Sequence, residues 1–185
     1  INTIIRSERD LVVSILSFLK LGIGGERFVA TSAIIEELAQ NFDNKVTLGG
    51  TSVRAALAMR KLGHTSALHL VTINDQVRDL LPPNCPYVCG NPADRSYPHL
   101  IVQFSKDTRV RAGDIDIHTS RPNRLIYHSD DANIIMNLNE EFADLITDAR
   151  VLLISGFNAM QDEALLADRI ACVLRMMRSL PEEAL

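Results

Sequence analysis

KVTL at 45–48, followed by Gly49, Gly50 and TSVRAALAMRKL at 51–62, is the stretch that decides the fold class. KVTL is typical of a short β-strand, and the segment after the glycines carries apolar residues at the i, i+3, i+4 and i+7 spacing of an amphipathic helix. These apolar residues are Ala55, Ala58, Met59 and Leu62. A strand, a glycine turn and a helix in immediate succession predict an α/β domain.

Two helices are predicted before this stretch. Ser7 and Asp10 form a capping pattern ahead of apolar residues at helical spacing, which predicts a first helix at 8–21. The glycine-rich segment GIGGERF at 22–28 is expected to be a turn, and a second helix is expected after Thr31 or Ser32. The second helix places three large apolar residues on one side, which are Ile35, Leu38 and Phe42.

Strands and helices alternate downstream, as in α/β proteins. Strands are predicted at 66–71, 99–104, 124–128 and 151–155, and helices at 137–146 and 162–179. The segments 81–98 and 105–123 are rich in turn-forming or charged residues and are expected to be irregular. Alternation along 99–104 places His99 and Gln103 on the face opposite the core, where polar side chains can meet a ligand.

The composition excludes several classes of protein. The chain has 185 residues, 46% of them apolar, and can bury a core. Its net charge of -4 offers no cationic field to a nucleic acid. No apolar run approaches the ~20 residues of a membrane span and no leader pattern opens the chain, so we expect a cytoplasmic protein. Three cysteines make no disulfide framework, and Cys85 and Cys89 lack two further ligands for zinc.

Five motifs together resemble a known family. They are GGERF at 24–28, GGTS at 49–52, HLIVQF at 99–104, RPNRLIYHSD at 121–130 and LLISGFNAMQ at 152–161. In order and spacing they resemble the ADP-dependent glucokinase and phosphofructokinase family, a branch of the ribokinase-like sugar kinases. The resemblance implies a three-layer α/β domain with a smaller β-rich lid that closes over the sugar, incomplete in this chain. It assigns 1–48 and 98–129 mainly to the lid and hinge, and 49–97 and 130–185 mainly to the α/β core.

The resemblance also implies an activity. Family members transfer a phosphoryl group from ADP to a sugar, here expected to be the 6-hydroxyl of glucose, with Mg²⁺ accompanying the nucleotide. Because the chain begins at Ile1 and stops at Leu185 in a helical pattern, both ends are expected to be cuts in a longer polypeptide. The half that binds ADP and carries the catalytic aspartate is expected beyond Leu185, so that this chain alone should not catalyse. Asp114 in AGDID lacks the leading glycine of the family's motif and is rejected as the base.

Seven residues are candidates for binding the sugar, and most of them also have a structural interpretation. Gly49 and Gly50 would let backbone amides approach a hydroxyl, or they shape the turn only. The Glu26 carboxylate would accept hydrogen bonds from two hydroxyls and repel a sugar phosphate, or it pairs with Arg27 in solvent. His99 matches a sugar-contacting histidine of the family, or it is an ordinary strand residue.

The remaining candidates are Thr51, Asn123 and Arg124. Arg124 would hold an acidic group or a substrate phosphate, or it closes a lid hairpin. Thr51 and Gln103 depart from the family, where Asn or Gln and a glutamate are common. These departures and the absent catalytic half leave open a non-catalytic sugar-binding or interaction module. A kinase for fructose 6-phosphate or another sugar is the other alternative. The string GIGGE is a partial dinucleotide motif, but it follows a helix and not a strand, so NAD is discounted.

Overall fold

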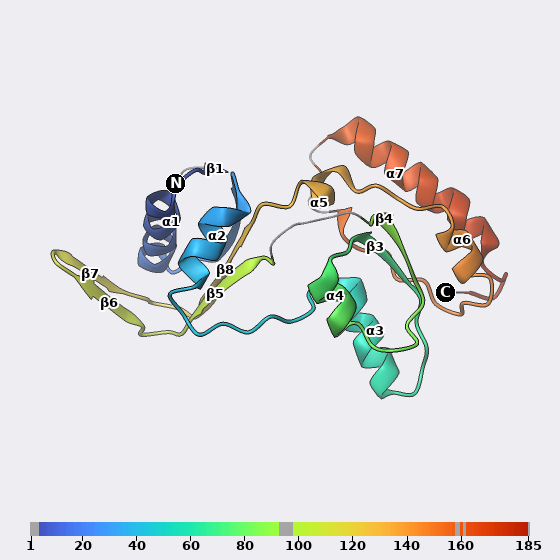
Figure 1. The fold of residues 1–185 in the computed structure, drawn as a ribbon, viewed down its shortest axis with the longest axis horizontal. Helices are drawn as coiled ribbons and strands as arrows, with labels where there is room; N and C mark the ends of the chain where they lie inside the picture. The colour runs from blue at the N-terminus through green and yellow to red at the C-terminus, as the bar shows by residue number, and fades with distance from the viewer. Residues whose placement is uncertain (1–3, 93–97, 158–159, 161, 185) are drawn as a thin grey trace. The chain divides into compact units, whose positions relative to one another are not determined.

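The computed structural model describes residues 4–92, 98–157, 160 and 162–184. The chain divides into two compact units, each with its own sheet and helices (Figure 1). Unit 1 comprises Ile1–Val46 and Ser96–Asp130. Unit 2 comprises Thr47–Arg95 and Asp131–Leu185. Among the described residues, no helix is both long and apolar enough to span a bilayer.

Unit 1 is built on a mixed four-stranded sheet in the order β1-β2-β8-β5. Its strands are β1 (Ile4–Ile5), β2 (Gly25–Val29), β8 (Asn123–His128) and β5 (Leu100–Phe104). The first three are parallel, and β5 runs antiparallel to β8. A hairpin of β6 (Arg109–Ala112) and β7 (Ile115–His118) joins β5 to β8 and projects from the sheet in Figure 1.

Local capping sets the bounds of α1 (Glu8–Leu21), as predicted for 8–21. The Ser7 hydroxyl accepts a hydrogen bond from the Asp10 amide at 3.1 Å, which satisfies one free donor of the first turn. At the other end Gly22 is left-handed with φ 64°, a conformation that glycine adopts without strain. The amides of Gly22 and Ile23 then donate to the last helical carbonyls.

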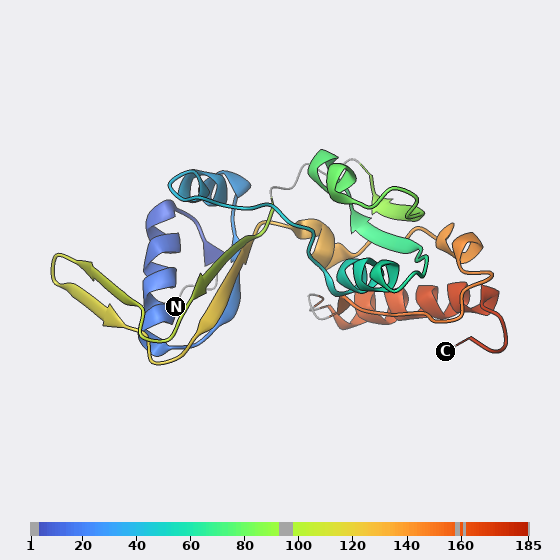
Figure 2. The ribbon, with the colours of Figure 1, turned by 90° about the horizontal axis from the view of Figure 1, so that it is seen from below.

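The core of unit 1 lies on one face of this sheet. Helix α1 lies along that face in Figure 2, and α2 (Ser32–Ala39) packs against it as well. The buried side chains come from both helices and from all four strands, and they are Ile5, Leu11, Phe18, Leu19, Val29, Ile35, Leu38, Phe104, Leu125 and Tyr127. Since side chains alternate along a strand, the intervening residues of β2, β8 and β5 project from the opposite, open face.

Unit 2 has a smaller parallel sheet of β3 (Leu68–Thr72) and β4 (Tyr87–Asn91). Its helices are α3 (Thr51–Lys61), α4 (Asp75–Leu80), α5 (Asp131–Ile135), α6 (Phe142–Leu145) and α7 (Glu163–Met176), which continues into the 3-10 turn η2 (Met177–Ser179). Leu68, Leu70 and Ile73 form the core of the sheet. Val53 and Ala56 of α3 pack against them, whereas the predicted stripe through Met59 and Leu62 is exposed.

Three segments predicted to lack strands contain them. The supposed turn at 22–28 includes the inner strand β2, the segment 81–98 includes β4, and the charged segment 105–123 includes the hairpin β6–β7. In each case non-local pairing overrides the local glycine, proline or charge signal. Residues 93–97 of the second segment lie outside the described residues.

Other predictions fail because a partner is missing. The segments 45–48 and 151–155, which were predicted as strands, pair with no strand among the described residues, and a segment becomes a strand only when a neighbour completes its ladder. Only Phe142–Leu145 is α-helical within the helix predicted at 137–146. The second helix is confirmed with Ile35 and Leu38 buried, although Phe42 lies beyond its end and is exposed.

Candidate functional site

The open face of the unit 1 sheet carries most of the predicted site residues of that unit. Glu26 of β2 is in register with Ile126 of β8, and Arg124 of β8 is in register with Gln103 of β5. His99 directly precedes β5 and lies next to His128 at the end of β8. The alternation predicted for 99–104 is confirmed, because Leu100, Val102 and Phe104 pack toward the core.

Glu26 and His128 form a pair across β2 and β8. The distance from His128 Nε2 to Glu26 Oε1 is 3.3 Å. The two side chains differ in access to solvent, since the Glu26 side chain is 52% exposed and that of His128 only 12%. His128 also contacts two rings, Phe28 edge-on at 5.8 Å and His99 at 5.1 Å between ring centroids. The carboxylate therefore stays accessible while its partner is held in place.

His99 has a buried partner of its own. The distance from His99 Nε2 to Asp130 Oδ2 is 3.4 Å, and the side chains are 37% and 5% exposed. Glu26 and His99 are thus two accessible polar side chains, each beside a buried one, and His128 touches both. The sequence pointed to Glu26 and His99 but not to the role of His128. The signal available was alternation along 124–128, which places His128 on the face of Arg124.

Glu26 lies in a strand and not in the predicted turn. Its neighbour Arg27 points to the other face of the sheet, where the guanidinium lies 4.8 Å from the ring centroid of Phe18 and Nη1 donates to the Glu26 backbone carbonyl. The carboxylate of Glu26 faces His128 instead. The alternative of an acid paired with Arg27 in solvent is therefore wrong.

The glycines before Glu26 have packing roles. A Cβ on Gly25 would lie 2.9 Å from the Phe18 ring, and a Cβ on Gly24 would overlap the Asn123 side chain. Both contacts are closer than side-chain carbons approach in proteins, so only glycine fits at either position. The pair lets β2 pack tightly on α1 and on the start of β8.

Asn123 and Arg124 lie at the opposite end of β8 from His128. The Asn123 side chain accepts a hydrogen bond from the Arg124 amide at 3.0 Å and lies against Gly24. Arg124 is exposed on the open face, about 13 Å along the strand from His128. A hollow of about 460 Å³ opens at this end, lined by Gln103, Phe104, Ser105, Pro122, Asn123 and Arg124.

The glycine turn of unit 2 leads into α3. Gly50 has φ 78°, and a Cβ placed on Gly49 or Gly50 meets no atom within 4 Å. Both glycines and Thr51 are exposed, so backbone amides at the start of α3 are open to a ligand. The hydroxyls of Ser52 and Ser155 lie 2.7 Å apart, so Ser155 of the motif at 152–161 lies beside this helix start.

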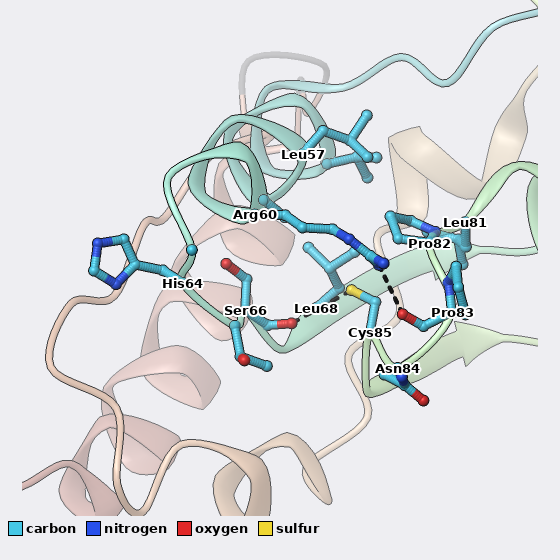
Figure 3. Close-up of a pocket in the computed structure, with 14 residues that line it drawn as sticks. Leu57, Arg60, His64, Ser66, Leu68, Leu81, Pro82, Pro83, Asn84 and Cys85 are labelled. Carbon is cyan, nitrogen blue, oxygen red and sulfur yellow. Dashed lines mark hydrogen bonds between the residues drawn. The ribbon is translucent and has the colours of Figure 1, made fainter.

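A second hollow, of about 270 Å³, lies in unit 2 at the other end of α3 (Figure 3). Arg60 reaches across it and donates from Nη1 to the Pro83 carbonyl at 2.7 Å. The Cys85 thiol donates to the Ser66 carbonyl at 3.3 Å, and burial raises the pKa of this thiol despite the opposing charge of Arg60. None of the predicted site residues lines this hollow. Within the described part of the chain, no three His, Cys, Asp or Glu side chains gather to hold a metal ion.

Comparison with known proteins identifies the family. The family described as ADP-specific phosphofructokinase/glucokinase conserved region matches residues 2–184. The chain belongs to this family. No curated protein sequence matches the chain. Membership confirms the resemblance carried by the five motifs, and the family is one of ADP-dependent sugar kinases.

Solved structures of this family share the fold. A last common ancestor of ADP-dependent phosphofructokinases from Methanosarcinales matches with a TM-score of 0.62 and 15% identity over 99% of this chain and 43% of its own. A hypothetical ADP-dependent phosphofructokinase from Pyrococcus horikoshii OT3 matches with a TM-score of 0.66 and 14% identity, covering 96% of this chain and 46% of its own.

An ADP-dependent kinase in complex with fructose-6-phosphate and ADPbetaS matches with a TM-score of 0.64 and 17% identity, over 98% of this chain and 46% of its own. The chain therefore has the ribokinase-like α/β fold of these kinases and spans less than half of their length.

Proposed function

We propose that this chain supplies the sugar-binding part of a kinase that transfers a phosphoryl group from ADP to the 6-hydroxyl of glucose. The observation that carries the proposal is that the accessible Glu26 carboxylate and the accessible His99 imidazole both lie against His128 on the open face of unit 1. A carboxylate accepts hydrogen bonds from two adjacent hydroxyls, and an imidazole donates to or accepts from a third. This is the chemistry that a neutral sugar offers.

The two units take different parts in this proposal. Unit 1 acts as the lid over the sugar, and unit 2 contributes to the α/β core. Gly49, Gly50 and Thr51 offer backbone amides at the start of α3 to a hydroxyl oxygen. Asn123 stays a proposed substrate contact at the start of β8.

The transfer itself needs groups that we assign to the part of the protein outside this chain. A base removes the proton of the 6-hydroxyl, the oxygen attacks the β-phosphorus of ADP in line, and AMP leaves. We propose that the base, the nucleotide and its Mg²⁺ are held by that part, since the chain spans less than half of the related structures. By itself the chain binds sugar without phosphorylating it.

Fructose 6-phosphate is the second candidate acceptor. Arg124 is exposed and lines the hollow at the start of β8, where its planar guanidinium suits a phosphate. Glu26 argues for glucose instead, because its negative charge repels a phosphate group nearby. The two substrates are therefore distinguished by which of the two side chains the enzyme needs.

Substitution of each side chain in the natural full-length polypeptide tests this proposal. Glu26→Gln keeps the size of the side chain and removes its charge, and we expect kcat/KM for glucose to fall by about 10- to 100-fold, the loss of one charge-assisted hydrogen bond. Glu36→Gln on the exposed side of α2 is the matched control. Unchanged glucose efficiency in Glu26→Gln, with fructose 6-phosphate efficiency lost in Arg124→Ala, would establish the second candidate.

A further inference from the structure

We propose that His128 is a positioning residue that orients the Glu26 carboxylate for the sugar, an inference that rests on the proposed function. His128 Nε2 lies 3.3 Å from Glu26 Oε1, within reach of a charge-assisted hydrogen bond when the ligand draws the pair together. His128 lies within the motif at 121–130, but neither that motif nor the family membership assigns it a role. Its position follows from the register that pairs the end of β2 with the end of β8.

The surroundings of His128 suit a residue that holds another and does not itself meet the ligand. Its side chain is 12% exposed, whereas that of Glu26 is 52% exposed. Phe28 meets the imidazole edge-on at 5.8 Å, and the ring of His99 lies at 5.1 Å on a tilt of 38°. These two contacts restrict the orientation of the imidazole, so that it offers Glu26 a fixed partner.

Holding Glu26 in place favours sugar binding because of entropy. A free glutamate side chain occupies many rotamers, and a ligand that needs one of them must bear the cost of ordering it. A carboxylate already oriented by His128 is spared that cost, which strengthens binding without any new contact to the sugar. This ordering cost arises on binding and not in the chemical step. Loss of the orienting contact with His128 should therefore raise KM for glucose and leave kcat unchanged.

Two substitutions of His128 separate its hydrogen bond from its packing. His128→Phe keeps an aromatic ring beside Phe28 and His99 but removes the donor, and His128→Gln keeps a donor without the ring. His118→Phe is the matched control, because His118 Nε2 also lies near a carboxylate, 3.5 Å from Asp107 Oδ1, but on the hairpin away from the open face.

The experiment is a double-mutant cycle in the natural full-length polypeptide, with KM and kcat for glucose measured with ADP and Mg²⁺. We expect His128→Phe to raise KM by about 5- to 20-fold while kcat stays within about twofold, and His128→Gln to recover most of the loss. In the Glu26→Gln background, His128→Phe should have no further effect, since no carboxylate is left to orient. His118→Phe should leave both constants unchanged.

The cycle distinguishes failure of this inference from failure of the proposed function. Suppose that Glu26→Gln weakens glucose use, and that His128→Phe raises KM for glucose by the same factor in the Glu26→Gln background as in the wild type. His128 then acts independently of Glu26, and the inference is overturned while the proposed function stands. An unchanged KM in His128→Phe has the same meaning. If Glu26→Gln leaves glucose use unchanged, both fail together. Circular dichroism shows whether each variant is folded. His128→Gln, which keeps a hydrogen-bond donor, distinguishes lost positioning of Glu26 from a folding defect.

Discussion

Tyr127→Phe removes the hydroxyl of a fully buried tyrosine on the core face of β8, directly before His128. That hydroxyl lies 3.0 Å from the hydroxyl of Ser14 on α1, and Ser14 is buried as well. The Ser14 hydroxyl then stays buried without its hydrogen-bond partner, which lowers the stability of unit 1 by about 1–2 kcal/mol. Removing both hydroxyls together costs less, because no polar group is then left without a partner.

Hydrogen exchange followed by mass spectrometry measures this locally. We expect the slowest amides of α1 and β8 to exchange about 5- to 30-fold faster in Tyr127→Phe, which is the factor that corresponds to this free energy. Amides of β3 in unit 2 are the internal control, and Tyr87→Phe on the exposed side of β4 is the control substitution. The Ser14→Ala/Tyr127→Phe double variant should exchange more slowly than either single one.

Two results would show that the Ser14–Tyr127 hydrogen bond does not stabilise unit 1. One is exchange of α1 and β8 at the wild-type rate in Tyr127→Phe, and the other is a double variant less protected than both singles. An alkaline titration adds an independent check, because burial raises the pKa of Tyr127 although the bond to Ser14 opposes this. The folded state favours the neutral Tyr127 hydroxyl, so the contribution of Tyr127 to the free energy of unfolding should be constant below the ordinary tyrosine pKa of 10.0 and fall above it. Tyr127→Phe should lack this fall.

Two further predictions concern unit 2. His69 Nε2 accepts a hydrogen bond from the Asn139 amide at 2.8 Å, and burial lowers the pKa of His69. Hydrogen-exchange protection of the β3 amides, corrected for intrinsic exchange, should therefore be constant above the ordinary histidine pKa of 6.5 and fall below it. His69→Phe should remove this pH dependence. Gly90→Ala places a Cβ against the Asn137 carbonyl and should lower stability by about 1–3 kcal/mol in thermal melts, while Gly49→Ala, which meets no atom within 4 Å, should not.

Features set by neighbouring residues were predictable from the sequence. Helix α1 begins and ends where predicted because Ser7 and Gly22 act on the adjacent backbone. The strand at 99–104 follows from its own alternation, which also placed His99 away from the core. In both cases the physical cause lies within a few residues of the structure that it determines.

Features set by distant residues were not predictable in this way. Gly24 and Gly25 were predicted to form a turn. In the structure they allow close packing against Phe18 and Asn123, and the sequence gives no sign of these contacts. Strand β4 depends on pairing with β3. Its Gly90 is needed because a Cβ there would overlap the backbone carbonyl of Asn137. The contact of His128 with Glu26 depends likewise on the register of β2 and β8. The sugar contacts themselves stay predictions.

Formation of hexose 6-phosphate by the natural full-length polypeptide tests whether the protein transfers a phosphoryl group from ADP to glucose. Glucose and Mg²⁺ are supplied with ADP or with ATP in parallel, and AMP is measured alongside the sugar phosphate. With ADP we expect glucose 6-phosphate and an equal amount of AMP. In Glu26→Gln we expect the reaction to be at least tenfold weaker, which corresponds to ~1.4 kcal/mol. Product with ATP alone, or no product from glucose while fructose 6-phosphate is phosphorylated, would contradict the proposed function.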